Sequence, residues 1–301
     1  MKKFVIITDS CSDLEKELRE AYDIDYVPMH FSFNGRDVVA SLDWEEIPAP
    51  DFYNIMRGGT RIITSQVNAE TFRDKFTKYL EEGYDVLYIG CSSALSNSVK
   101  ASYIVRDELL AKYPDSKIIC IDSLISCYGL GILCMIASEL RKEGKSIDEV
   151  SDYIMAHRLE VNQEATVESL KYLKQAGRVS ATSAFFGGIL SIKPIIISDA
   201  IGQNFAIEKV KGRKVSFSRL VERMKEEFKP HERQKVYIGH ADCLEDANEL
   251  KRMVLEAFPN EKLDIHVGYI GPIVGASVGP GTLGLYFLGK EVTVNGEKVN
   301  A

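Results

Sequence analysis

Four clusters rich in hydroxyl side chains follow predicted β-strands in the first half of the chain. They are Thr8–Asp13, Thr64–Gln66, Ser92–Ser98 and Asp122–Ser126. In open α/β sheets, ligands collect beyond the carboxyl ends of the strands, where these clusters are expected to lie. None of the four contains Lys or Arg. The chemistry available to them is hydrogen bonding to an anionic group, or attack by an activated hydroxyl.

The first cluster does not match an aspartyl phosphotransferase. That chemistry needs a second carboxylate two residues after the nucleophile, but Cys11 stands two residues after Asp9 and the next acid is Asp13. We interpret Asp9 or Ser10 as the end of a strand, and a role of this cluster in lining a pocket stays open. We expect Asp13 to help cap a helix, because Asp accepts hydrogen bonds from the free N–H groups of a first turn.

The third cluster partly resembles the nucleophile elbow of α/β-hydrolases. Its Gly90-Cys91-Ser92-Ser93-Ala94 run has Ala where the elbow has a second Gly. A triad would also need a downstream His, and His231, His240 and His266 have no supporting motif around them. A serine hydrolase or esterase using Ser92 or Ser93 is therefore one alternative. Two others remain open: a plain helix cap, and an anion site where this loop enters a helix near Ser98.

The remaining patterns predict neither a cofactor site nor a metal site. A G-x-G-x-x-G pattern at Gly279–Gly284 is followed by only 17 residues, too few for the βαβ unit of a dinucleotide fold. The five histidines are scattered, and no two of the six cysteines form a C-x-x-C pair. We expect no metal and no cofactor, and we interpret the cysteines as buried structural thiols.

Composition indicates a protein of two domains that does not bind nucleic acid. The 301 residues are 45% apolar, and 37 Lys and Arg against 44 Asp and Glu give a net charge of −7 with no basic block. The longest apolar runs are well short of the ~20 residues that span a bilayer. The first residues indicate a strand and not a signal peptide. We expect a cytoplasmic protein without stable membrane insertion.

The predicted elements indicate an α/β fold with two domains. In the first half, apolar runs at Phe4–Thr8, Asp85–Gly90 and Lys117–Asp122 are typical of parallel strands buried on both faces. Helical periodicity lies between and after them, at Ala69–Glu82, Ser98–Tyr113 and Cys127–Glu143. We therefore predict an N-terminal parallel βαβ domain at residues 1–160.

Residues 161–301 are predicted to form a mixed, partly antiparallel α/β domain. A helix is expected at Thr166–Ala176, and Ile192–Ser198 with Phe205–Val210 is expected to form a hairpin. The further elements are helices at Ser216–Phe228 and Glu245–Phe258, strands at Lys235–Gly239, Leu263–Tyr269 and Leu285–Leu288, and a Gly-rich segment at Gly268–Gly284.

Seven motifs in order resemble the DegV family of bacterial fatty-acid-binding proteins. They are Ile7–Ser10, Thr64–Gln66, Ser92–Ser96, Asp122-Ser123, Leu170–Ser180, Lys193–Ile195 and Gly275–Gly281. The resemblance covers nearly the whole chain. It implies a DegV-like two-domain fold that holds one long-chain fatty acid, of the palmitate or oleate class, between the domains. No catalytic activity is implied for the chain itself.

The resemblance also implies roles for individual residues. Thr64 and Ser96 match the family's contacts to the fatty acid carboxylate, and weaker contacts are expected from Ser65, Ser93, Asn97 and Ser277. Arg178 and Arg213 match basic positions of members that present the fatty acid to a fatty acid kinase, as docking or head-group residues.

The implied biological role is lipid transport or fatty acid metabolism. Many members carry a His where this chain has Ser277, which leaves the kinase partnership open. A regulatory module that senses lipid is a further alternative.

Overall fold

The computed structural model describes residues 2–180 and 192–296. Its first sheet is four-stranded and fully parallel, in the order β2-β1-β6-β7. The strands are β1 Phe4–Asp9, β2 Ile24–Val27, β6 Asp85–Gly90 and β7 Ile118–Asp122. Every residue of β6 is buried, because helices cover both faces of the sheet. The predicted parallel N-terminal sheet is confirmed.

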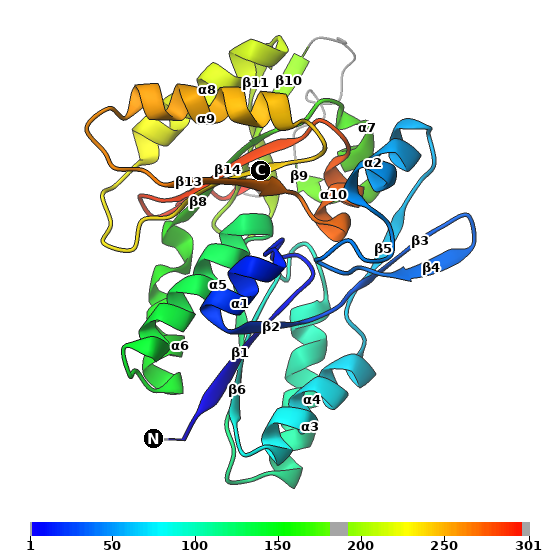
Figure 1. The fold of residues 1–301 in the computed structure, drawn as a ribbon, viewed down its shortest axis with the longest axis vertical. Coiled ribbons are helices and arrows are strands. Elements are labelled where there is room, and N and C mark those ends of the chain that lie inside the picture. The colour runs from blue at the N-terminus through cyan, green and yellow to red at the C-terminus, as the bar shows by residue number, and fades with distance from the viewer. Residues whose placement is uncertain (1, 181–191, 297–301) are drawn as a thin grey trace.

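Two groups of helices flank this sheet (Figure 1). One group is α3 Ala69–Glu81 and α4 Ser98–Lys112; the other is α1 Lys16–Tyr22, α5 Cys127–Lys142 and α6 Ile147–His157. Helix α5 also packs against the second sheet, and it is therefore buried on nearly all sides. Two glycines permit this packing. A Cβ on Gly129 would lie 2.4 Å from Ile125, and one on Gly131 would lie 2.7 Å from Leu14.

The second sheet is seven-stranded and mixed, in the order β13-β12-β14-β8-β10-β11-β9. Its outer face is covered by α8 Arg213–Glu227 and α9 Leu244–Ala257 (Figure 1). The predicted hairpin of Ile192–Ser198 with Phe205–Val210 is confirmed as an antiparallel pair. The strands are β8 Val161–Thr166, β9 Val179–Ser180, β10 Ile192–Ser198, β11 Asn204–Lys211, β12 Val236–His240, β13 Ile265–Tyr269 and β14 Leu283–Leu288.

The predicted helix at Thr166–Ala176 is too long at its start. Residues 161–166 form the fully buried strand β8, and helix α7 covers only Leu170–Ala176. The sequence did not predict this strand, because polar residues interrupt its apolar pattern. One of them, Glu164, is buried in an ion pair with Arg223, at 2.6 Å. A buried charge of this kind is tolerated only with its partner in place.

A small antiparallel sheet and two short helices stand beside the main sheets (Figure 1). The sheet order is β4-β3-β5, and α10 packs against β3, β5, α2 and α7. The sequence predicted only a Gly-rich segment where α10 lies. The bounds are β3 His30–Phe33, β4 Arg36–Val39, β5 Ile63–Ser65, α2 Ala49–Arg57, α10 Pro272–Val278 and the 3₁₀ turn η1 Arg158–Glu160. No helix in residues 2–180 and 192–296 is long and apolar enough to cross a membrane.

The buried carboxylate of Asp9 joins the ends of β1 and β6. Its Oδ1 accepts from the N–H of Cys11 at 2.9 Å, and its Oδ2 accepts from the N–H of Cys91 at 2.9 Å and the Tyr88 hydroxyl at 2.7 Å. Asp9 is fully buried, and burial raises its pKa although these hydrogen bonds act in the opposite direction. The sequence predicted that Asp9 or Ser10 ends a strand, and Asp9 is the last residue of β1; its link to a second strand was not predicted.

Asp13 lies where the first loop meets the start of α10. It does not cap α1, whose N-cap residue is Glu15, so the predicted capping role is wrong. Its Oδ1 lies so close to Gly271 that a Cβ there would be 2.4 Å away. Burial raises the pKa of Asp13 to about 8.

Replacing Asp9 by Ala should destabilise the protein by about 3 to 5 kcal/mol, because it leaves three buried donors without an acceptor. Urea unfolding followed by circular dichroism measures the loss. Asp152→Ala is the control: Asp152 is exposed on α6, and its change should stay within about 0.5 kcal/mol. Equal effects of the two variants would contradict the proposed linking role of Asp9.

Asp13 should make the protein less stable as the pH rises towards 8. Its folded pKa lies above its unfolded value, so the folded state holds an extra proton between about pH 4 and 8 and loses that advantage across this window. Asp13→Asn should remove about 2 kcal/mol of the stability difference between pH 6 and pH 8, at up to about 1.4 kcal/mol per pH unit.

Urea titrations at both pH values test this expectation, with Asp152→Asn as the control that keeps the parent slope. An Asp13→Asn variant with the same slope as the parent would show that Asp13 titrates normally.

Candidate functional site

A cavity of about 560 Å³ lies beyond the carboxyl ends of β1, β6 and β7. Strand β5 and helix α10 form further parts of its wall. The volume is within the range of about 300 to 1,000 Å³ found for small-molecule sites. The predicted ligand position at the strand ends therefore coincides with a real cavity.

Most of the predicted site residues line this cavity. Thr64 and Ser65 come from β5, Ser93, Ser96 and Asn97 come from the loop before α4, and Ser277 comes from α10. Arg178, after α7, completes the set. Thr64 and Ser96 are half-buried, whereas Ser65 and Asn97 are exposed. Residues more than 200 positions apart in the chain thus share one polar wall.

Ser98 connects the two loops that carry Thr64 and Ser96. Its hydroxyl lies 3.0 Å from that of Ser96, and it accepts from the N–H of Val67 at 3.1 Å. The side chain is fully buried. The sequence identified Ser98 as a helix start but gave no signal for this connection, which depends on a contact between distant segments.

Other lining residues of the cavity are apolar or carry sulfur. Cys11, Met29 and Cys91 are almost fully buried, and Ile273 and Val278 of α10 line the cavity beside them. Hydrogen bonding to Cys91 and burial raise the pKa of the Cys11 thiol well above its usual value. The cavity therefore offers neutral, apolar side chains in addition to its hydroxyls.

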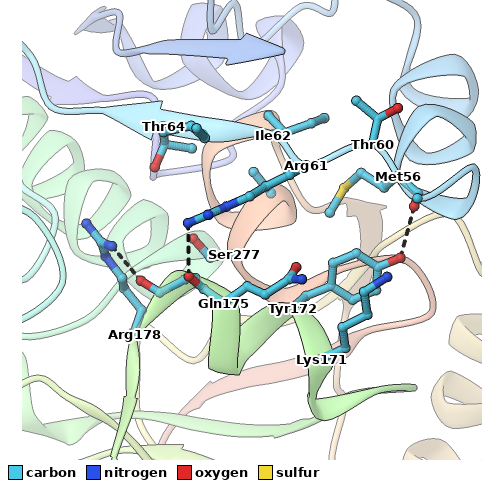
Figure 2. Close-up of a pocket in the computed structure, with 14 residues that line it drawn as sticks. Met56, Thr60, Arg61, Ile62, Thr64, Lys171, Tyr172, Gln175, Arg178 and Ser277 are labelled. Carbon is cyan, nitrogen blue, oxygen red and sulfur yellow. Dashed lines mark hydrogen bonds between the residues drawn. The ribbon is translucent and has the colours of Figure 1, made fainter. Parts of the chain in front are cut away.

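A second, smaller cavity of about 70 Å³ adjoins the first and shares Thr64, Arg178 and Ser277 with it (Figure 2). Arg61 also lines it and donates to the Gln175 carbonyl at 3.4 Å. In Figure 2 the guanidinium groups of Arg61 and Arg178 both lie near Thr64 and Ser277. Two cations thus lie at the polar end, and sequence reasoning missed Arg61 although it stands three residues before Thr64.

Each of these arginine side chains is held by backbone carbonyls. Arg178 donates to the carbonyls of Ala176 at 2.5 Å and Leu95 at 3.4 Å. Both arginines are exposed, so neither guanidinium group loses its hydration, which a buried charge would lose at a large cost in free energy.

Arg213 does not line the main cavity. It forms ion pairs with Asp246 at 2.8 Å and Glu168 at 3.7 Å, beside a separate cavity that also contains Arg57 and Cys243. A head-group contact from this position would need a large movement of the side chain. Its predicted role in docking a partner stays a prediction.

In the part of the chain that the structure describes, neither candidate serine hydroxyl of the serine-hydrolase alternative is hydrogen-bonded to a His, Asp or Glu side chain. The Asp122 carboxylate accepts from the backbone N–H of Ser93 at 3.1 Å, and not from its hydroxyl. Ser92 is fully buried and its hydroxyl accepts from the N–H of Ala94 at 3.2 Å. Ser93 lines the cavity, but the lining residues that the structure describes include no His, Asp or Glu. A serine nucleophile needs an adjacent base to be activated.

The six cysteines are free thiols, and four of them are buried. Across residues 2–180 and 192–296, no three His, Cys, Asp or Glu side chains are placed to hold a metal ion together.

Comparison with known proteins places the whole chain in one family. The family model described as "Uncharacterised protein, DegV family" matches residues 3–290. A DegV domain-containing protein of Clostridium perfringens is 39% identical over 289 residues, which are 96% of this chain and 98% of that relative.

Solved structures agree with this relationship. One is a fatty acid-binding DegV family protein from Thermus thermophilus, with a TM-score of 0.84 and 26% sequence identity. The match covers 96% of this chain and all of that chain. A stearic acid-binding protein from Eubacterium ventriosum has a TM-score of 0.83 at 25% identity, covering 95% and 98% of the two chains. The fold, the ordered motifs and these matches lead to one conclusion: the chain belongs to the DegV family.

Proposed function

We propose that this protein binds one long-chain fatty acid in the main cavity and has no catalytic activity of its own. The observation that carries the proposal is the mixed lining of the cavity. Hydroxyls and Arg178 line it together with buried sulfur and aliphatic side chains, and Arg61 lines the smaller adjoining cavity. This lining suits a ligand with a carboxylate head and an apolar tail. Fatty acid binding by structural relatives adds support.

The acyl tail supplies most of the proposed affinity. Burying roughly fifteen methylene groups at about 0.8 kcal/mol each contributes about 12 kcal/mol before ordering costs. That gross value corresponds to a dissociation constant of about 1 nM, and the costs of association reduce it. The head group then needs only a few good hydrogen bonds.

Thr64 and Ser96 are the proposed carboxylate contacts. Both are half-buried, so a carboxylate between them would lose part of its water and depend on the two hydroxyls. Hydrogen bonds to a charged group contribute about 1.5 to 3 kcal/mol each. Ser65, Ser93, Asn97 and Ser277 offer weaker contacts on the same wall, and Arg178 offers a charge.

We further propose a two-domain organisation, residues 1–160 and 161–301, with the lipid between the domains. The four-stranded sheet uses residues 4–122 and the seven-stranded sheet uses residues 161–288. The cavity receives residues from both segments, since Ser96 comes from the first and Ser277 from the second.

A carrier role in the cytoplasm is the last part of the proposal. The polar end of the cavity is partly exposed, so a fatty acid kinase could reach the carboxylate without removing the tail. Arg178 and Arg213 are candidate docking residues for such a partner. The partnership is tested by adding a kinase subunit to the loaded protein and measuring acyl phosphate.

Protein purified from a bacterial host should contain about one fatty acid per chain. Denaturation, extraction with organic solvent and mass spectrometry measure the content directly. Absence of fatty acid in the extract, together with no uptake of added palmitate or oleate, would rule out the proposed function.

The double variant Thr64→Ala with Ser96→Ala should bind palmitate about 2 to 5 kcal/mol more weakly, because a partly desolvated carboxylate loses two partners. Titration calorimetry on the delipidated protein measures the difference. Thr77→Ala with Ser218→Ala is the matched control, on α3 and α8 away from the cavity. If both double variants bind like the parent, the carboxylate lies elsewhere.

A further inference from the structure

Three sulfur atoms from three separate segments meet in the apolar wall of the main cavity. The Sγ of Cys11 lies 3.7 Å from the Sδ of Met29, and Cys91 stands beside Cys11 because the Asp9 carboxylate accepts from the backbone N–H groups of both. All three side chains line the cavity. Binding of a fatty acid does not require sulfur here, since any aliphatic side chain would serve the tail.

The backbone holds these three residues in place. Asp9 accepts from the N–H groups of both Cys11 and Cys91, which fixes the two loops beside each other at the ends of the paired strands β1 and β6. Met29 is fixed to the same region, because its N–H donates to the Ser10 hydroxyl at 2.9 Å. The exposed fractions of Cys11, Met29 and Cys91 are 3%, 1% and 1%, so their side chains have little freedom.

The spacing suits a single ion bound by more than one sulfur. Two sulfurs that each lie about 2.3 Å from one ion, at trigonal or tetrahedral angles, are roughly 3.8 to 4.0 Å apart. The observed 3.7 Å between Cys11 and Met29 is close to that value. Thiolate and thioether ligands select soft ions such as Cu(I), whereas Mg²⁺ and Ca²⁺ need oxygen ligands. The described lining residues include no carboxylate and no imidazole.

We propose that Cys11, Cys91 and Met29 form a three-sulfur site for a soft monovalent metal ion of the Cu(I) class, reached through the main cavity. Binding replaces the two thiol protons: Cu⁺ and two S–H groups give a Cu(I) bis-thiolate and two released protons, with Met29 as a neutral third donor. No electron is transferred. The proposal is independent of the proposed fatty acid binding, because it rests on other atoms of the cavity.

An anaerobic competition titration tests the site. Reduced full-length protein, as purified and after native removal of lipid on a hydrophobic resin, is added to the coloured Cu(I) complex of bicinchoninate. We expect one equivalent of Cu(I) to move to the protein, and X-ray absorption to show only sulfur neighbours. Failure of both preparations to take Cu(I) from bicinchoninate would overturn the proposal, whatever their fatty acid content.

Variants assign the ligands. Cys11→Ser and Cys91→Ser should each weaken Cu(I) binding by more than about 100-fold, since loss of a residue that only orients a ligand already costs about 10- to 100-fold. Met29→Leu keeps the size and apolar character of the side chain and should weaken binding by about 10-fold. Cys134→Ser is the matched control, because Cys134 is equally buried but does not line the cavity.

Circular dichroism melting checks that each variant is folded. If the cysteine variants unfold, the Cu(I) affinity of Met29→Leu tests the proposal. An affinity equal to that of the parent protein would overturn the three-sulfur site. A loss in Cys134→Ser as large as in Cys11→Ser would also overturn it.

Discussion

One buried carboxylate determines how the cavity is built. Asp9 binds backbone N–H groups from the loops after β1 and β6, and it also accepts from the Tyr88 hydroxyl. A carboxylate without water must have all of its partners in place, so these loops cannot separate without a large loss of free energy. The positions of Cys11, Cys91 and the serine-rich loop that follows therefore depend on this single group.

The cavity combines properties that no single segment could supply. Its hydroxyls come from an edge strand and from the loop before α4, and its cations stand before β5 and after α7. Its apolar part is formed by residues of α10 and by the sulfurs at the strand ends. Because α10 packs against β3, β5, α2 and α7, one short helix brings the small sheet and helix α7 together beside the cavity.

Elements with uninterrupted apolar patterns could be predicted from the sequence, and elements stabilised by specific partners could not. Strands β1, β6 and β7 are continuous apolar runs because helices cover both faces. Strand β8 is fully buried, as β6 is, but Asn162, Gln163 and Glu164 lie in it and depend on hydrogen bonds or an ion pair from other elements. Helix α10 was not predicted because its segment is rich in glycine. Gly275 leaves room for Tyr53, and Gly271 leaves room for Asp13.

The sequence by itself determined the α/β class, the parallel first sheet, the family and the residue types of the polar wall. Ordered motifs and apolar periodicity are local properties, so they can be read along the chain. Only the tertiary structure decided which of those residues meet: Arg61 joins Thr64, Arg178 and Ser277, whereas Arg213 turns to Asp246 and Glu168. The convergence of Cys11, Met29 and Cys91 was likewise decided by strand pairing and the buried Asp9, because contacts between distant segments leave no periodic pattern in the chain.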